Sequence, residues 1–181
     1  SEDDGRFLGF DIKGKTLGVL GLGSIGTRVA ELGLALGMKV VAYNRTPRKI
    51  PNVMMLSLDE VLKISDIISV NLALTHETEY IISHRELNLM KQSAVLINTA
   101  AAPHIDEQAL CKALIEKRIF GAGLDLLTTE GADNPLFGLD NIVFSPHAGW
   151  WTKEAQEKLR ATIIANVESF IKGKPLNVVS K

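Results

Sequence analysis

The stretch that decides the fold reads Thr16-Leu-Gly-Val-Leu-Gly21-Leu-Gly23-Ser-Ile-Gly26. Its apolar first half predicts a buried strand, and residues 24–36 continue it with helical periodicity. The three glycines have the spacing G-x-G-x-x-G, which is specific where it joins a strand to a helix, as it does here. We therefore expect a loop that binds the phosphates of a dinucleotide, against the alternative of a glycine-rich turn without a ligand.

Each glycine of this loop has a physical role in that interpretation. Gly21 permits the tight turn, Gly23 lets the backbone approach a pyrophosphate, and Gly26 lets the helix pack closely on the strand. The N-terminus of the helix then offers unpaired N–H donors and a positive dipole end to the anion.

Short apolar runs and helical stretches alternate along the rest of the chain. The predicted strands are residues 16–20, 39–43, 53–56, 67–72, 94–98, 122–126 and 141–144, and the predicted helices are 24–36, 58–64, 85–90, 106–117 and 152–171. Strands that alternate with crossover helices form a parallel sheet covered on both faces, which explains their continuous apolar character. The expected fold class is α/β, a Rossmann-type doubly wound parallel sheet in three αβα layers, with ligands at the carboxyl ends of the strands.

Composition bounds the class of protein. The chain has 181 residues, of which 46% are hydrophobic and 23% charged, and its net charge is −1, so we expect one globular domain and neither nucleic acid nor an anionic membrane as partner. The polar start, Ser1 to Gly5, does not predict a signal peptide. The single cysteine, Cys111, excludes an intrachain disulfide, suits a cytoplasmic location, and is expected in a helix core. No metal site is expected.

The residues after the second strand bear on the choice of dinucleotide. An NAD site usually has an acidic residue about 20 residues beyond the loop, which bonds the ribose 2′-hydroxyl. Here Asn44, Arg45 and Thr46 stand at that place, without a carboxylate. These side chains could bond a 2′-phosphate, Arg45 with charge assistance. We expect NADP to be preferred over NAD, with a solvated basic turn as the alternative.

Several ordered motifs resemble one known family. They are the glycine loop, Leu74-Thr-His-Glu-Thr78, Asn98-Thr-Ala100, Gly123-Leu-Asp125 and Ser145-Pro-His-Ala-Gly149. Together they are similar to the D-2-hydroxyacid dehydrogenases, which include phosphoglycerate dehydrogenases and glyoxylate/hydroxypyruvate reductases. The resemblance implies hydride transfer between nicotinamide and the C2 carbon of a 2-keto or 2-hydroxy acid.

The resemblance also implies roles for single residues. His147 falls on the position of the family's acid–base histidine, and imidazole suits proton transfer near neutral pH. Glu130 falls on the glutamate that orients it, and Asp125 on the contact to the nicotinamide end of the cofactor. Taken singly, His147 could be a turn residue and Glu130 a solvated loop acid. Trp150 and Trp151 could wall a substrate pocket, seal an interface, or pack on another domain.

The expected cofactor-binding residues share a position at or just after a strand end. They are Gly21, Gly23, Ser24, Ile25, Gly26, Asn44, Arg45, Thr46, Thr78, Thr99, Ala100, Asp125, His147 and Gly149.

Two departures from the family bear on activity. Ala101 stands where the family has the arginine that grips the substrate, a loss that typically costs about 10²–10³ in rate. The family's separate substrate domain is also absent, so we expect residues 1–181 to be one dinucleotide-binding domain that turns over no substrate alone. A corepressor-like dinucleotide sensor, favoured by Ala101, is the alternative from another class. A third possibility, an adenosylhomocysteinase-like enzyme, fits the glycine loop but not Ser145–Gly149. A homodimer is the family default.

Overall fold

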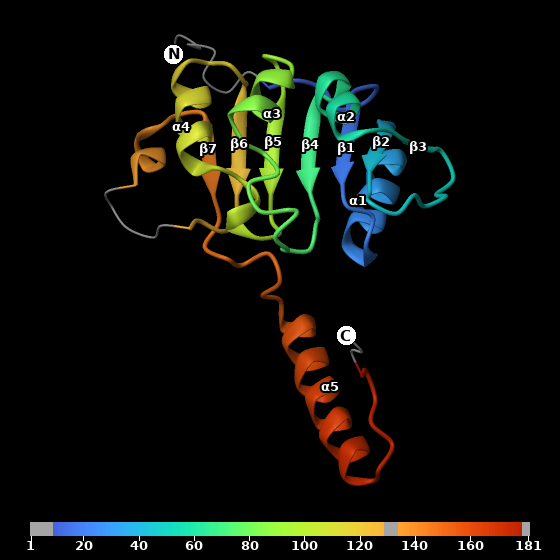
Figure 1. Ribbon diagram of the computed structural model, residues 1–181. Coiled ribbons are helices and arrows are strands. Elements are labelled where there is room, and N and C mark those ends of the chain that lie inside the picture. The colour runs from blue at the N-terminus through green and yellow to red at the C-terminus, as the bar shows by residue number, and fades with distance from the viewer. Residues whose placement is uncertain (1–8, 129–133, 179–181) are drawn as a thin grey trace, which may run out of the picture. The chain divides into compact units, whose positions relative to one another are not determined.

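A parallel sheet of seven strands organises the chain (Figure 1). The computed structural model describes residues 9–128 and 134–178. The strands lie in the order β3-β2-β1-β4-β5-β6-β7, and every neighbouring pair is parallel. Their bounds are Thr16–Leu20 (β1), Lys39–Tyr43 (β2), Val53–Met55 (β3), Ile67–Val70 (β4), Val95–Asn98 (β5), Gly121–Leu124 (β6) and Ile142–Phe144 (β7).

Helices cover both faces of the sheet. Their bounds are Ser24–Ala35 (α1), Leu58–Ile64 (α2), His84–Leu89 (α3) and Glu107–Ile115 (α4), with short 3-10 helices at Ala102–His104 (η1) and Pro135–Gly138 (η2). Consecutive strand residues point to opposite faces, so Val19 belongs to one core and Leu20 to the other. Apolar residues of α2, α3 and α4 pack with Leu20, and α1 contributes Ala30 to the core around Val19. The predicted three-layer αβα architecture is confirmed.

The chain divides into two compact units, residues 1–146 and 147–181. The second unit contains α5, Lys153–Ile171, whose first turn is capped by Thr152 through a bond from the Ala155 N–H. None of the residues of α5 is buried. Across the described part of the chain, no helix has the length and apolarity to cross a membrane.

The predicted elements are confirmed within a few residues, and two differences are instructive. The fourth strand ends at Val70 rather than residue 72, and the Asn71 carboxamide that follows it bonds Ser69. Neither 3-10 helix was predicted, since each is a single turn without apolar periodicity. Cys111 is buried in the core as expected.

One acidic side chain ties the amino edge of the sheet together and makes it sensitive to acid. The Asp66 carboxylate accepts the Thr16 N–H at 2.8 Å and the Lys91 ammonium at 2.8 Å. Burial alone would raise the pKa of Asp66, but the two donors outweigh it and hold the pKa below its ordinary value. A depressed folded-state pKa contributes stability above the ordinary value, and that contribution is lost as pH falls through the folded-state pKa.

We expect Asp66→Asn to lower the unfolding free energy at pH 7 by about 1–2 kcal/mol. The loss of stability below about pH 4 should then be shallower than in the wild type. Urea denaturation at several pH values measures both, with exposed Asp140→Asn as the control. An identical pH slope in Asp66→Asn and wild type would show that Asp66 contributes nothing to acid sensitivity.

Candidate functional site

The predicted site residues of the first unit gather at the carboxyl edge of the sheet. The glycine loop follows β1, Asn44 to Thr46 follow β2, Thr78 lies after β4, Thr99 and Ala100 follow β5, and Asp125 follows β6. Because all seven strands run in one direction, these connections meet at one edge, to which the arrowheads point in Figure 1. This is the edge at which doubly wound sheets bind ligands.

Packing within the protein explains two of the three loop glycines. Gly21 has φ +94°, and a β-carbon there would lie 2.7 Å from the Asn71 carbonyl oxygen. A β-carbon on Gly26 would lie 1.8 Å from the Gly21 carbonyl oxygen, so helix α1 can start this close to the strand only with glycine at 26. A β-carbon on Gly23, in contrast, would meet nothing within 4 Å. The space beside Gly23 is therefore open for the pyrophosphate that the sequence predicts there.

The start of α1 is suited to an anion. Gly23 is its N-cap and supplies no side-chain cap, and the first turn contains no acidic residue. The helix dipole and the leading N–H groups therefore face the loop without a competing carboxylate. Ile25 is 69% exposed, which leaves a large apolar side chain at the loop for contact with a ligand.

The Asn44 side chain is largely occupied within the protein. Its carboxamide oxygen accepts the Leu22 N–H at 2.9 Å, and its nitrogen donates to the Thr46 carbonyl at 2.6 Å. Asn44 therefore shapes the glycine loop and the turn after β2, with one carboxamide hydrogen left for a ligand. The neighbouring Arg45 is exposed and pairs with Glu77, Nη1 to Oε2 at 2.6 Å.

The connection after β4 is held by its own hydroxyl groups. Thr78 donates from Oγ1 to the Ala73 carbonyl at 2.7 Å and accepts the Thr75 N–H at 2.8 Å. The segment after β5 is held similarly by the buried Asn98, which accepts the Ala100 N–H and donates to the Ala101 carbonyl. Thr78 and Asn98 thus set the backbone that the expected cofactor contacts depend on.

His104 joins these two connections, and the sequence had given it no role. Its side chain is fully buried, with Nδ1 3.0 Å from the Thr78 carbonyl oxygen and Nε2 3.0 Å from the Leu72 carbonyl oxygen. Since a carbonyl oxygen only accepts, the ring bonds these carbonyls through the hydrogen that a ring nitrogen carries. Backbone bonds from Tyr80 to Pro103 and from Ile82 to His104 reinforce the junction. Its signal in the sequence is a histidine inside an otherwise apolar segment.

The last strand ends bring Asp125 and Ser145 together. Asp125 is buried and accepts a hydrogen bond from the Ser145 hydroxyl. The segment after Asp125 is held by Glu107 at the start of α4, which accepts from the Thr128 N–H and from the Asn134 side chain. The expected acid Glu130 lies outside the described residues.

The remaining site residues belong to the second unit. His147 has φ +51°, a left-handed conformation that is uncommon outside glycine and is often found at functional positions. Its ring lies 6.5 Å from that of Trp150, and Trp150 stacks on Trp151 with 6.2 Å between centroids. Gly149 lies between His147 and Trp150 in the sequence. Both indoles are exposed, at 49% and 69%.

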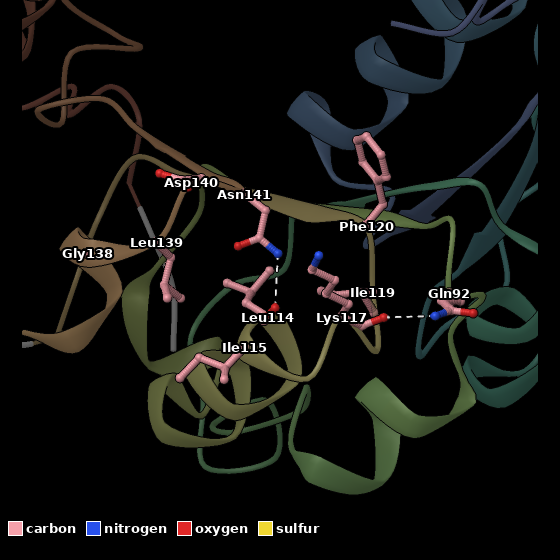
Figure 2. A pocket seen from close by; sticks show the side chains of 10 residues that line it. All are labelled: Gln92, Leu114, Ile115, Lys117, Ile119, Phe120, Gly138, Leu139, Asp140 and Asn141. Atoms are coloured by element: carbon pink, nitrogen blue, oxygen red, sulfur yellow. Dashed lines mark hydrogen bonds between the residues drawn. The ribbon is translucent and has the colours of Figure 1, made fainter. Parts of the chain in front are cut away.

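A pocket of about 650 Å³ lies at the opposite, amino edge of the sheet (Figure 2). Its walls include Phe120 before β6 and Asn141 before β7. Figure 2 shows two of its amides bonded within the protein, Asn141 to the Leu114 carbonyl and Gln92 to the Lys117 carbonyl. The phosphate-binding geometry is at the other edge, so this pocket is separate from the candidate site.

The strand order, the glycine loop after β1 and the clustered strand ends define a dinucleotide-binding domain of the Rossmann type. The chain belongs to the D-isomer specific 2-hydroxyacid dehydrogenases, whose NAD binding domain matches residues 2–149.

Individual relatives agree with this family. The chain is 42% identical to a glyoxylate reductase of Thermococcus litoralis, covering 97% of this chain and 55% of that protein. A solved structure of an acyclic imino acid reductase in complex with NADPH and D-Arg has a TM-score of 0.94 at 43% identity, covering 99% of this chain and 58% of that one. A D-lactate dehydrogenase with NAD+ from Lactobacillus jensenii has a TM-score of 0.90 at 30% identity, covering 100% of this chain and 60% of that one. The chain thus spans somewhat more than half the length of these relatives.

Proposed function

We propose that residues 1–181 form the cofactor-binding domain of an oxidoreductase that transfers hydride between NAD(P)H and the C2 carbon of a 2-keto or 2-hydroxy acid. The observation that carries the proposal is the glycine loop. Gly21 and Gly26 are required by the protein's own packing, whereas the space beside Gly23 is open and lets a ligand approach the backbone between them. The bound nicotinamide would supply the hydride, and the residues of this chain bind and orient the dinucleotide.

NADP is the proposed cofactor. The described turn after β2 presents the Arg45 guanidinium and the Thr46 hydroxyl and contains no acidic residue of its own. The imino acid reductase noted above, at 43% identity, is in complex with NADPH, and the less similar lactate dehydrogenase, at 30%, is with NAD+.

Separate titrations of the chain with NADPH and NADH test both proposals. We expect NADPH to bind at least about tenfold more tightly, because a charge-assisted Arg–phosphate contact is worth roughly 1.5–3 kcal/mol. Calorimetry, or quenching of Trp150 and Trp151, gives the two dissociation constants. Equal or tighter NADH binding would contradict the NADP preference. Binding of neither by a folded chain would contradict the cofactor-binding function itself.

For catalysis we propose His147 as the group that holds and donates the proton at the substrate oxygen, with Glu130 orienting its imidazole. The other wall of the cleft belongs to a substrate domain outside residues 1–181, a proposal supported by the greater length of the relatives. The chain by itself then binds NADPH without turning over substrate. Oxidation of NADPH by the purified chain on addition of glyoxylate or hydroxypyruvate would overturn this.

Ala101 favours a second candidate function, the reduction of an imine in place of a ketone. In that reaction hydride adds to the imine carbon and the nitrogen, once protonated, becomes the amine. A protonated imine is already polarised and cationic, so a guanidinium beside it would repel it, whereas the methyl group of Ala101 would not. The similarity to an acyclic imino acid reductase supports this candidate. The corepressor-like alternative has no comparable support among the described residues.

The two reactions separate in the enzyme that carries this chain together with its substrate domain. NADPH oxidation is followed with a 2-keto acid alone and with the same acid plus ammonia, which forms the imine in solution. A rate that depends on ammonia supports imine reduction, and a rate independent of ammonia supports ketone reduction.

We further propose a homodimer and a cytoplasmic location, without nucleic acid or membrane partners. The family default supports the first, and the single cysteine and near-neutral net charge of −1 support the rest. Sedimentation of the full chain measures the oligomeric state, and a monomer at micromolar concentration would contradict the dimer.

A further inference from the structure

One ion pair lies at the carboxyl edge of the sheet, beside the glycine loop. Arg45 Nη1 lies 2.6 Å from Glu77 Oε2, and the two residues are 32 positions apart in sequence. Arg45 follows β2, Glu77 follows β4, and these strands flank β1 on its two sides. The pair therefore spans the end of β1, where the glycine loop begins.

This ion pair contributes little to the stability of the fold. The two side chains are 78% and 69% exposed, and ion pairs this exposed stabilise folded proteins only weakly. Both connections are also held by other means, the turn after β2 by Asn44 and the connection after β4 by Thr78 and His104. At the carboxyl edge, no other ion pair among the described residues joins two connections.

The pair sets up a competition for Arg45. A phosphate accepts charge-assisted and frequently bidentate hydrogen bonds from a guanidinium, and it carries more negative charge than a carboxylate. A 2′-phosphate that bonds Arg45 has to displace the Glu77 carboxylate or lie beside it. A 2′-hydroxyl offers no charge to compete and leaves the pair intact.

Resting on the proposed NADP-binding function, we propose that Glu77 is a specificity-determining residue. Its carboxylate occupies Arg45 in the free protein and thereby limits the preference for NADPH over NADH. Without Glu77 the guanidinium is free for the 2′-phosphate, so NADPH affinity rises and NADH affinity does not. Glu77 acts through Arg45, and its effect on discrimination is absent when Arg45 is absent.

The test compares Glu77→Gln with wild type in NADPH and NADH titrations of the full chain. We expect NADPH to bind about threefold to fivefold more tightly in the variant, the upper range for one exposed ion pair, with NADH unchanged. The gain should shrink as salt rises, because exposed charges are screened. Glu79→Gln is the matched control, an exposed glutamate on the same connection with no ion pair in the described residues.

A double-mutant cycle with Arg45→Gln decides whether the effect passes through Arg45. The proposal requires that Glu77→Gln gain nothing in NADPH affinity when Arg45 is already glutamine. An equal gain in both backgrounds would make Glu77 a simple repulsive charge and overturn the competition. A wild type that binds NADPH, with a Glu77→Gln that gains nothing, overturns this inference alone, whereas a folded wild type that binds neither dinucleotide overturns the proposed function with it.

Discussion

Replacing Gly26 by alanine should abolish dinucleotide binding and destabilise the chain. The new β-carbon would lie 1.8 Å from the carbonyl oxygen of Gly21 and 3.0 Å from its carbonyl carbon. Both are backbone atoms of the loop, so no side chain can rotate away, and the start of α1 has to move off β1. Overpacking of this kind costs about 3 kcal/mol or more in unfolding free energy. Urea denaturation followed by circular dichroism measures the loss.

Gly23→Ala is the matched control for this prediction. Its β-carbon would meet no atom within 4 Å, and the φ of −69° at Gly23 is one that alanine readily adopts. We expect the stability of the wild type, with NADPH affinity reduced at least about tenfold, because the methyl group occupies the space of the pyrophosphate. Wild-type stability in Gly26→Ala would contradict the packing argument. Wild-type NADPH affinity in Gly23→Ala would place the pyrophosphate elsewhere.

The elements that the sequence predicted well are those whose cause is local. Strand β4 is buried in the middle of the sheet and is apolar except for Ser69, so the run could be predicted without knowing its neighbours. The start of helix α2 is marked in the sequence by a capping box, in which Ser57 and Glu60, three residues apart, cap each other. The glycine loop was also predictable, because its spacing is local and Gly26 is required by the carbonyl oxygen of Gly21, five residues earlier.

The features that the sequence could not predict depend on contacts between distant segments. Asn44 is predicted to bond the cofactor, and its carboxamide is in addition bonded to Leu22 and Thr46, an arrangement that no spacing rule reveals. The Arg45–Glu77 pair exists because β1 lies between β2 and β4, an order that the sequence alone leaves open. The roles of His147 and Glu130 remain predictions, since they rest on resemblance.

The segment after β5 is a further place where the sequence alone did not predict the local conformation. The run Ala100-Ala-Ala102 has no pattern of its own, and its backbone is held by Asn98 before it and by the backbone of His104 after it. Position 101, where the resemblance places the family's arginine, is therefore set by the Asn98 carboxamide and by the His104 backbone, whose N–H bonds the Ala101 carbonyl. A substitution at Asn98 should change the geometry around position 101 even though the sequence there stays the same.

Replacing His104 by leucine should destabilise the chain by about 2–4 kcal/mol. Leucine fits an apolar site but donates no hydrogen bond. The Leu72 and Thr78 carbonyl oxygens, each 3.0 Å from a ring nitrogen in the wild type, then lose the polar ring that faces them in a buried location. An unsatisfied buried acceptor costs roughly 1–3 kcal/mol, and the two oxygens belong to the same connection. Urea denaturation measures the change in unfolding free energy.

Local opening distinguishes this role of His104 from general loss of core packing. The amides of Tyr80 and Ile82 donate to the carbonyls of Pro103 and His104, so they should exchange hydrogen faster in His104→Leu than amides of the distant strand β2. His76→Leu, an exposed histidine on the same connection, is the control and should leave stability and exchange unchanged. His104→Gln keeps a donor for one carbonyl and should recover about half of the lost stability. If His104→Leu were as stable as the wild type, with Tyr80 and Ile82 equally protected, the buried histidine would not be what joins the two connections.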